Sequence, residues 1–469
     1  MPINLNNPIH STSDAFKKIA PDLQGNILSS HGRDHANHVF IRFKSPASAR
    51  SFIKKEIAGR MTSAAKQKQN SKDFKSRKSN GLRTFKNFSL SHEGYRFFTI
   101  EDGQIPSDET FRGGMVASIG PLKDPTQADW EKAFQKNWHA VLIIANKSPT
   151  LLKIRTSFLR AKLNNIATVH VETGTGIRNN EGAHIEHFGY VDGISQPHLL
   201  TDEIEEGKIA TNNWHPAAPL SLALVPDPGG NPDALGSYFV FRKLEQNVKA
   251  FKLAEADLAQ QIGTSVDVAG AQMVGRFRSG TPLIPVEPPQ PGPASKMNDF
   301  NYDGEGSTDS KCPFHAHIRK TNPRGTGGFE LREDEKAHLF PRRGITYGKD
   351  PKNTSIDPEG DVGLLFMAYN SNLKTQFEFM QSSWANNTGF PGQAGGPHGI
   401  DPIIGQGEDA GGQHHYEKWG DDTSKKRIKP SLGNFVTMRG GEYFFTPSIS
   451  FLKSIGRSSS RLHGAIPQI

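Results

Sequence analysis

The stretch Ser237-Tyr238-Phe239-Val240-Phe241-Arg242 decides the fold, because it reads as an apolar, aromatic strand that opens a pattern of strands and helices. Residues 243–261 follow with apolar side chains near one face, which predicts a helix. Residues 362–369 then form a second apolar strand, and residues 372–384 a second helix. The C-terminal half is therefore expected to alternate strand and helix twice.

The N-terminal half carries a similar order of elements. Residues 38–43 alternate like a half-buried strand, and residues 47–66 read as a helix. Residues 128–137 look helical, and residues 138–145 form an apolar run typical of a buried strand. Two such units predict an α+β fold of two ferredoxin-like domains packed as a pair, whereas periodicity alone leaves open a single irregular α+β domain.

Length and composition suit two domains with long connecting loops. The chain has 469 residues, 35% of them hydrophobic, and its 29 Phe residues supply bulky material for a core. We place an N-terminal domain at residues 1–185 and a C-terminal domain at residues 186–469. The 47 Gly and 31 Pro residues gather in connectors at 215–232, 282–310 and 389–420. Connectors of this length are either functional or disordered.

The charge balance is 56 − 48 = +8, and much of the excess lies between Lys54 and Lys86. A solvated basic loop accounts for this segment, and a docking surface for an anionic partner is the alternative. The segment lacks regularly spaced aromatic residues, so we expect no nucleic-acid groove.

Cysteine content and hydropathy bear on location. Cys312 is the one cysteine, so no intrachain disulfide can form, which fits a reducing compartment. No run approaches the roughly 18 to 20 apolar residues that span a bilayer. Residues 1–7 lack the basic and then apolar pattern of an export signal. We therefore expect a cytoplasmic protein that has no membrane partner.

The stretch Gly189-Tyr190-Val191-Asp192-Gly193 fixes a carboxylate between two glycines. Glycine lets the backbone turn sharply and approach a flat ligand closely. An acid held on such a turn suits proton transfer at a bound cofactor, although Asp-Gly is above all a turn signal. Asp192 is thus a candidate for proton transfer, with a plain turn as the alternative.

Residues 312–324 bring two histidines and several basic side chains together, and imidazole is a common ligand of haem iron. On a strand, His315 and His317 would share a face and could form a two-histidine metal site. At the start of a helix they would diverge and leave one to ligate. A basic surface loop explains the pattern as well. No Cys-x-x-Cys-His motif is present, so any haem would lack thioether links.

Two further segments follow this region. Residues 340–348 contain Arg342 and Arg343 before a glycine, a pattern usually found in a solvated turn. Residues 363–369 most simply form a core strand.

Six segments, taken in order, resemble the dye-decolourising peroxidases, a haem peroxidase family. They are residues 22–28, 189–193, 317–320, 342–344, 363–366 and 440–448. The likeness covers nearly the whole chain. It implies two ferredoxin-like domains of the dimeric α+β barrel type, with haem b bound non-covalently in the C-terminal half.

The resemblance also implies the roles of individual residues. His317 would ligate the haem iron, and Asp401 would orient its other ring nitrogen. On the opposite face, Asp192 would move the peroxide proton. Arg342 would stabilise the charge on the departing oxygen, with Arg343 as the alternative arginine. The remaining contacts with the haem would come from Leu364 and Phe366 on the distal face and from Arg324 or Arg319 at a propionate.

The activity so implied is that of a haem peroxidase. It would reduce hydrogen peroxide and oxidise aromatic donors, dye-like or phenolic, in one-electron steps through an oxyferryl intermediate. Bulky dyes cannot enter a small pocket, so their electrons would pass through a surface radical site at Trp384 or Tyr347. The alternative is that both are ordinary core or boundary aromatics. An aspartate base, with an unperturbed pKa of about 3.9, predicts that peroxide activation persists into the acidic range.

Two other functions compete with this interpretation. One is a non-enzymatic haem carrier or sensor, which needs His317 but has no use for an acid and an arginine beside the iron. The other is a non-haem metal protein that uses His315 and His317 together with His398, His414 and His415.

Overall fold

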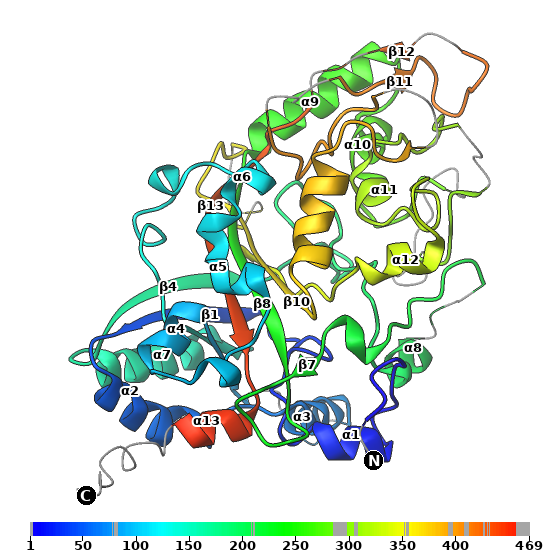
Figure 1. Cartoon of the computed structure of the whole chain (residues 1–469). Coiled ribbons are helices and arrows are strands. Elements are labelled where there is room, and N and C mark those ends of the chain that lie inside the picture. The colour runs from blue at the N-terminus through cyan, green and yellow to red at the C-terminus, as the bar shows by residue number, and fades with distance from the viewer. Residues whose placement is uncertain are drawn as a thin grey trace, which may run out of the picture.

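The structure is a computed structural model of the chain, and it combines an antiparallel sheet with helices around it (Figure 1). It describes residues 3–76, 78, 83–207, 209, 212–284, 298–303, 308–350, 352, 356–392, 397–407, 412–424, 427–428, 430 and 432–455.

The first set of strands comes from the N-terminal half. They are β1 (His35–Phe43), β2 (Phe85–Leu90), β3 (Ala140–Asn146) and β4 (Ala167–Thr175), in the spatial order β4-β1-β3-β2. Helix α7 (Pro149–Leu163) packs against β1, β3 and β4. It begins where Ser148 caps it, because the Ser148 hydroxyl accepts a hydrogen bond from the Leu151 amide.

The second set repeats this order in the C-terminal half. Strands β8 (Leu235–Gln246), β9 (Ile345–Tyr347), β10 (Gly363–Asn370) and β13 (Val436–Thr446) lie in the order β13-β8-β10-β9. In each half the fourth strand neighbours the first, and the third separates the first from the second. This is the ferredoxin-like arrangement, so the expected α+β fold with two such units is confirmed.

The two sets join into one sheet. Strand β2 pairs with β13 at Leu90 and Phe445, and the joined sheet within the described ranges has nine strands once β7 (Val225–Pro226) is included beside β8. The two ends of the sheet also meet, because the Thr346 hydroxyl of β9 donates to the Thr175 carbonyl of β4 at 2.5 Å. The sheet therefore curls around a shared interior.

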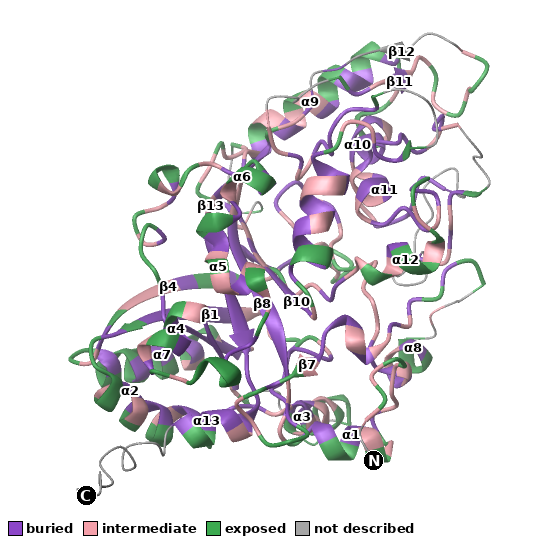
Figure 2. Ribbon diagram, in the orientation of Figure 1, coloured by how far each residue is buried: buried purple, intermediate pink, exposed green. Residues whose placement is uncertain are grey.

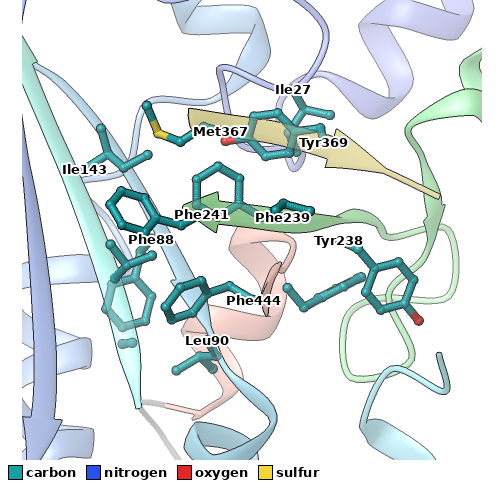
Figure 3. Packing of buried hydrophobic residues seen from close by; sticks show 14 of the residues in the cluster. Ile27, Phe88, Leu90, Ile143, Tyr238, Phe239, Phe241, Met367, Tyr369 and Phe444 are labelled. Carbon is teal, nitrogen blue, oxygen red and sulfur yellow. The ribbon is translucent and has the colours of Figure 1, made fainter. Parts of the chain in front are cut away.

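Aromatic side chains fill that interior. Phe40 lies edge-on to Phe241 with ring centroids 4.8 Å apart. Phe239 and Phe444 extend the same cluster (Figure 3). Strands β8 and β13 are buried along most of their length, whereas exposed residues follow the outer faces of the helices (Figure 2). The abundant Phe residues thus hold the two repeats together through one core.

The remaining helices and short strands surround this sheet. The helices are α1 (Asp14–Ile19), α2 (Pro46–Phe52), η1 (Ile53–Ile57), α3 (Ala64–Lys75), α4 (His92–Phe97), η2 (Asp102–Gln104), α5 (Glu109–Ala117), α6 (Ile119–Leu122), η3 (Gln127–Asp129), α8 (Thr201–Gly207), η4 (Leu220–Leu222), α9 (Val248–Gln261), α10 (Val266–Val274), α11 (His317–Thr321), α12 (Arg332–Ala337), η8 (Lys374–Glu378), η9 (Met380–Ala385) and α13 (Ile449–Ile455). The short strands are β5 (Ile177–Arg178), β6 (His184–Ile185), β11 (His415–Tyr416) and β12 (Arg427–Ile428). Over the described ranges, no helix is both long and apolar enough to cross a bilayer.

Two sequence-based expectations for local structure are wrong. Residues 128–137 are not a helix beyond the short turn η3, because Phe134 is buried and stacks on Phe241, and the Glu131 amide donates to the Arg439 carbonyl of β13. Tertiary contacts override the helical pattern here. The basic segment is not a loop either, because α3 occupies much of it and Lys68 pairs with Asp202.

Other boundaries shift by a few residues. The helix expected from residue 243 begins at Val248, because β8 continues through Gln246 and the Asn247 side chain caps α9. The domain boundary at residue 185 stays a prediction. It falls between the two strand sets, which share one sheet. Parts of the connectors at 282–310 and 389–420, and Arg77 of the basic segment, lie outside the described residues.

Candidate active site

Asp192 lies on a turn that follows β6. Its amide donates to the His184 carbonyl at 3.0 Å, and its Oδ1 accepts from the Gly193 amide at 2.6 Å. Gly189 and Gly193 have φ angles of 98° and 82°, a conformation that L side chains rarely adopt. The two glycines that flank Asp192 in the sequence therefore permit the turn that presents its carboxylate.

Arg342 is the cation beside this carboxylate. Its Nη1 lies 3.5 Å from Asp192 Oδ1, and the two side chains are 31% and 36% exposed. The Arg342 amide donates to Gln196 Oε1 at 2.9 Å, which ties the arginine to the segment that follows Asp192. A pair so open to solvent contributes little to stability, but a small ligand can reach both groups.

The neighbouring Arg343 turns the other way. Its guanidinium donates to the carbonyls of Asn26 at 2.8 Å, Ile27 at 3.0 Å and Arg342 at 2.8 Å. Burial lowers the pKa of Arg343 to about 10. Of the two arginines, the structure brings Arg342 to Asp192 and uses Arg343 to fasten the N-terminal segment around residues 26–27.

Strand β10 provides an apolar surface next to Arg342. Arg342 forms a bridge opposite Ala368, and residues directly opposite in a ladder point to the same face. Leu364 and Phe366 lie four and two positions before Ala368, so they share that face, and both are half-buried. Phe366 packs on Phe377 with ring centroids 5.9 Å apart.

His317 begins helix α11 and is oriented by a buried acid. Its Nδ1 lies 2.8 Å from Oδ2 of Asp401, whose side chain is fully buried. The other Asp401 oxygen accepts from the amides of Ile403 at 2.7 Å and Ile404 at 3.1 Å. The carboxylate therefore holds the proton of the imidazole on Nδ1 and leaves the lone pair on Nε2 for a metal.

His315 does not share this orientation. Its Nε2 lies 3.0 Å from His415 Nε2, and His415 Nδ1 lies 2.9 Å from Gln272 Oε1. Burial holds the pKa of His315 well below its usual range, so its ring is neutral. His398 packs on the ring of Phe314. In the part of the chain that the structure describes, no group of three His, Cys, Asp or Glu side chains is placed to hold a metal ion.

A cationic corner lies beside the Asp192 segment. Arg324 donates to Ser195 Oγ at 3.3 Å and to Asn298 Oδ1 at 2.6 Å, and Arg276 donates to both oxygens at 3.1 Å. Burial lowers the pKa of Arg324 to about 9 and that of Arg276 to about 10, and the charge of Arg342 also lowers the pKa of Arg276. Two buried guanidiniums that share neutral acceptors form a site suited to carboxylates.

No sequence motif singles out Arg276, which follows helix α10. Ser195, in contrast, belongs to the run after Asp192 and could have been chosen as a partner of Arg324. Arg319 is placed differently from Arg324, because it is fully buried, donates to the Cys312 carbonyl at 2.5 Å and lies over the ring of Phe314.

Neither aromatic candidate for the surface radical site is at the surface. Trp384 is 2% exposed and Tyr347 8% exposed. Trp384 stacks on Phe390 at 5.2 Å beneath a cavity of about 240 Å³ that the exposed Phe329 also lines. Its carbonyl accepts from Lys320 of α11, the helix that begins with His317. Trp384 therefore lies between a surface cavity and the helix that carries His317, whereas Tyr347 lies at the sheet edge.

These residues fit an iron porphyrin. His317 offers an oriented imidazole, Asp192 and Arg342 offer an acid and a cation, and β10 offers an apolar face. The cationic corner suits the propionates, because Arg324 has no carboxylate within ion-pair distance among the described residues. The donor set is thus what a haem would require.

Comparison with known proteins agrees over both halves of the chain. Residues 22–179 match the family model described as the DyP dimeric alpha+beta barrel domain, and residues 207–390 match the Dyp-type peroxidase C-terminal model. The multifunctional dye peroxidase DyP2 of Amycolatopsis sp. is 42% identical over 477 residues, which cover 97% of this chain and 100% of that protein. Dye-decolorizing peroxidase AauDyP1 of Auricularia auricula-judae is 30% identical, covering 92% of this chain and 85% of that protein.

Solved structures give the same result. DyP2 from Amycolatopsis sp. matches with a TM-score of 0.90 at 40% identity, over 96% of this chain and 100% of that one. The DyP-type peroxidase AnaPX from Anabaena sp. matches with a TM-score of 0.89 at 40% identity, over 96% of this chain and 99% of that one. With both family models matched and relatives aligned over nearly its whole length, the chain belongs to the DyP-type, or dye-decolourising, family of haem peroxidases.

Proposed function

We propose that the chain binds haem b non-covalently, with His317 Nε2 as the iron ligand and with Asp192 and Arg342 as the groups that act on hydrogen peroxide. Arg324 and Arg276 would receive the propionates, with Ser195 between them. When bound, the haem accepts two oxidising equivalents from peroxide and passes them on to donors in single-electron steps. The observation that carries the proposal is the Asp192–Arg342 pair, 3.5 Å apart and open to a small ligand.

Asp192 is suited to moving the peroxide proton. Its carboxylate would accept the proton from one oxygen of the peroxide and return it to the other oxygen, so that this second oxygen leaves as water. The turn between Gly189 and Gly193 fixes the carboxylate through its backbone. A group held in this way loses little freedom at the moment of transfer, which favours the reaction.

Arg342 is suited to stabilising the departing oxygen. Negative charge develops there as the O–O bond breaks, and a fixed guanidinium lowers the energy of that charge. Arginine stays cationic at any working pH. Leu364 and Phe366, on the same face of the sheet, would exclude part of the water and so strengthen the interaction.

Asp401 supports the opposite side. Its carboxylate accepts a hydrogen bond from His317 Nδ1 and gives the imidazole more anionic character, so Nε2 becomes a stronger donor. We propose aromatic compounds, dye-like or phenolic, as the reducing substrates. The names of the relatives, dye-decolorizing and multifunctional dye peroxidases, support this choice.

Two substitutions test the assignment of roles. The variants Asp192→Asn and Arg342→Leu should retain haem, because Asp192 and Arg342 pair with each other whereas His317 is held by Asp401. Stopped-flow absorbance should show the reaction with peroxide slowed by about 10²–10⁴-fold without the acid. It should slow by about 10²–10³-fold without the cation. Haem-loaded variants that react with peroxide at the wild-type rate would refute these roles, and a haem carrier or sensor would behave in that way.

A further inference from the structure

The carboxylate of Glu186 lies inside the turn that presents Asp192. Its Oε1 accepts from the Tyr190 amide at 2.9 Å, and its Oε2 accepts from the Phe188 amide at 2.8 Å. The Glu186 backbone closes the same turn, since its amide donates to the Tyr190 carbonyl and its carbonyl accepts from the Gly189 amide. One side chain thus organises the main chain over the residues that lead to Asp192.

The same carboxylate ties the turn to the central sheet. Gln246 ends strand β8 and donates from Nε2 to Glu186 Oε2 at 2.5 Å. Arg278 holds the outside of the turn, because its Nη1 donates to the Phe188 carbonyl at 2.6 Å and its carbonyl accepts from the Val191 amide at 3.3 Å. The turn is therefore fixed from within by Glu186 and from without by Arg278.

Only a carboxylate satisfies this set of donors. Three N–H groups, from Phe188, Tyr190 and Gln246, converge on the two oxygens from different sides. A glutamine in place of Glu186 would present its NH₂ group to at least one of them, so a donor would face a donor. Leaving a buried N–H without an acceptor is costly, so the turn would have to move.

Burial of Glu186 disfavours the ionised form of its carboxyl group. Burial raises the pKa of Glu186 to about 7, although its three hydrogen bonds oppose the shift, and the charge of Asp192 adds to the rise. Because the charge of Asp192 raises the pKa of Glu186, the two carboxylates are close enough to interact. The peroxide chemistry leaves Glu186 unused, and its side chain is bonded to the main chain of the turn that leads to Asp192.

We propose that Glu186 is a positioning residue for Asp192: by accepting the Phe188 and Tyr190 amides and anchoring them to Gln246, it aims the Asp192 carboxylate at the peroxide site. This inference rests on the proposed role of Asp192. Glu186 itself exchanges no proton with peroxide. Its contribution is expected in the peroxide reaction and not in the later oxidation of donors.

A double-mutant cycle tests the proposal in the haem-loaded protein. Glu186→Gln should slow the reaction with peroxide by about 100-fold, because a displacement on the order of 1 Å costs that much. In the Asp192→Asn background the same change should cost less than about twofold, because residues that act as a unit are not additive. Equal losses in both backgrounds would overturn the proposal. If Asp192→Asn alone has no effect, the proposed function fails instead, so the two failures are distinct.

Hydrogen exchange provides a readout that does not depend on turnover. Amides of the peptide covering residues 186–193 should exchange faster in Glu186→Gln and at the wild-type rate in Asp192→Asn. The matched control is Glu442→Gln, because Glu442 is a second carboxyl whose pKa burial raises to about 7, and it contacts Met115 and Tyr443 instead of the turn. That control should leave both the exchange of residues 186–193 and the peroxide rate unchanged.

A second variant covers the case in which Glu186→Gln does not fold. Gln246→Leu removes the hydrogen bond from β8 to Glu186, and both Glu186 oxygens can still accept the amides of Phe188 and Tyr190. It should slow the peroxide reaction by about tenfold, the equivalent of one hydrogen bond to a charged group, and leave the single-electron oxidation of a small phenol by the activated enzyme unchanged. A wild-type peroxide rate in Gln246→Leu, or an equal loss in both steps, would contradict the positioning role.

Discussion

The Nδ1 atom of His317 lies 2.8 Å from Oδ2 of Asp401, a carboxylate that is fully buried. Asp401 is itself fixed, because its second oxygen accepts the amides of Ile403 and Ile404. A buried carboxylate of this kind decides which ring nitrogen carries the proton. The relationship therefore controls both the direction and the donor strength of the imidazole.

Asp401→Asn should weaken the proximal ligand. The asparagine oxygen can keep the Ile403 and Ile404 amides, so its NH₂ group would face His317 Nδ1 and favour the tautomer with the proton on Nε2. That nitrogen is the one proposed to bind iron. We expect a loss of about 10–100-fold in haem affinity or peroxidase activity, measured by haem titration and initial rates. Unchanged values for both would show that the carboxylate does not act on the imidazole.

The two adjacent arginines should give opposite phenotypes. Arg343→Met removes three hydrogen bonds to the carbonyls of Asn26, Ile27 and Arg342 and leaves buried acceptors without donors. We expect it to lower the free energy of unfolding by about 3 kcal/mol, measured by denaturant titration of the haem-loaded protein. The folded fraction should still react with peroxide at close to the wild-type rate. Arg342→Leu, in contrast, should retain stability and lose rate.

The repeated strands of the two halves could be predicted from the sequence, but the way in which the two halves join into one sheet could not. Strands such as β8 and β10 were predictable because a buried strand needs a continuous apolar run. The pairing of Leu90 with Phe445 was not, because it joins residues far apart in the chain and no local pattern records it. The same limitation explains the wrong helix at 128–137, where burial of Phe134 against Phe241 outweighs local propensity.

The site shows a similar division. Asp192, Arg342 and His317 stand in short motifs, and the structure brings the first two together. Arg276 and Glu186 could not be chosen from sequence, because their importance comes from the partners that the fold gives them and not from neighbouring residues. Burial is likewise a tertiary property, so the sequence left open whether Trp384 carries electrons from the surface or is an ordinary core residue, and the structure shows it enclosed.

Trp384 should matter for bulky donors alone. It lies under the cavity lined by Phe329 and Phe390. Its carbonyl accepts a hydrogen bond from Lys320 of α11, the helix that begins with His317. Helix α11 lies beside the gold helix that includes η9 and Trp384 (Figure 1). Trp384→Phe keeps the stacking on Phe390 but removes the readily oxidised indole. We expect kcat/KM to fall for a large dye and to stay unchanged for a small phenol, measured by steady-state kinetics.

Tyr347, the other aromatic candidate, offers a matched control for Trp384. Tyr347→Phe serves as the control, because Tyr347 lies on β9, the last strand in the order of the sheet, and does not line the cavity that Phe329 lines. It should leave both substrates unaffected. A loss of dye oxidation in Tyr347→Phe, with none in Trp384→Phe, would reverse the assignment.

Glu442 should make stability depend on pH between the acidic and neutral ranges. Burial raises its pKa from the ordinary value of 4.5 to about 7, so above pH 4.5 the unfolded chain releases a proton that the folded chain retains. Stability is therefore fully present below pH 4.5 and is lost as the pH rises towards 7. Glu442 Oε1 accepts both the Met115 and Tyr443 amides, and a glutamine oxygen can replace it.

Glu442→Gln should remove this dependence. Relative to the wild type, the free energy of unfolding of the variant should increase by roughly 1–3 kcal/mol between pH 5 and pH 8, measured by thermal unfolding of the haem-loaded protein at both pH values. The exposed Glu101, changed to Gln, is the control and should show no such trend. A difference that stays constant with pH would mean that Glu442 is ionised in the folded protein at both values, held by the two amides more strongly than burial opposes it.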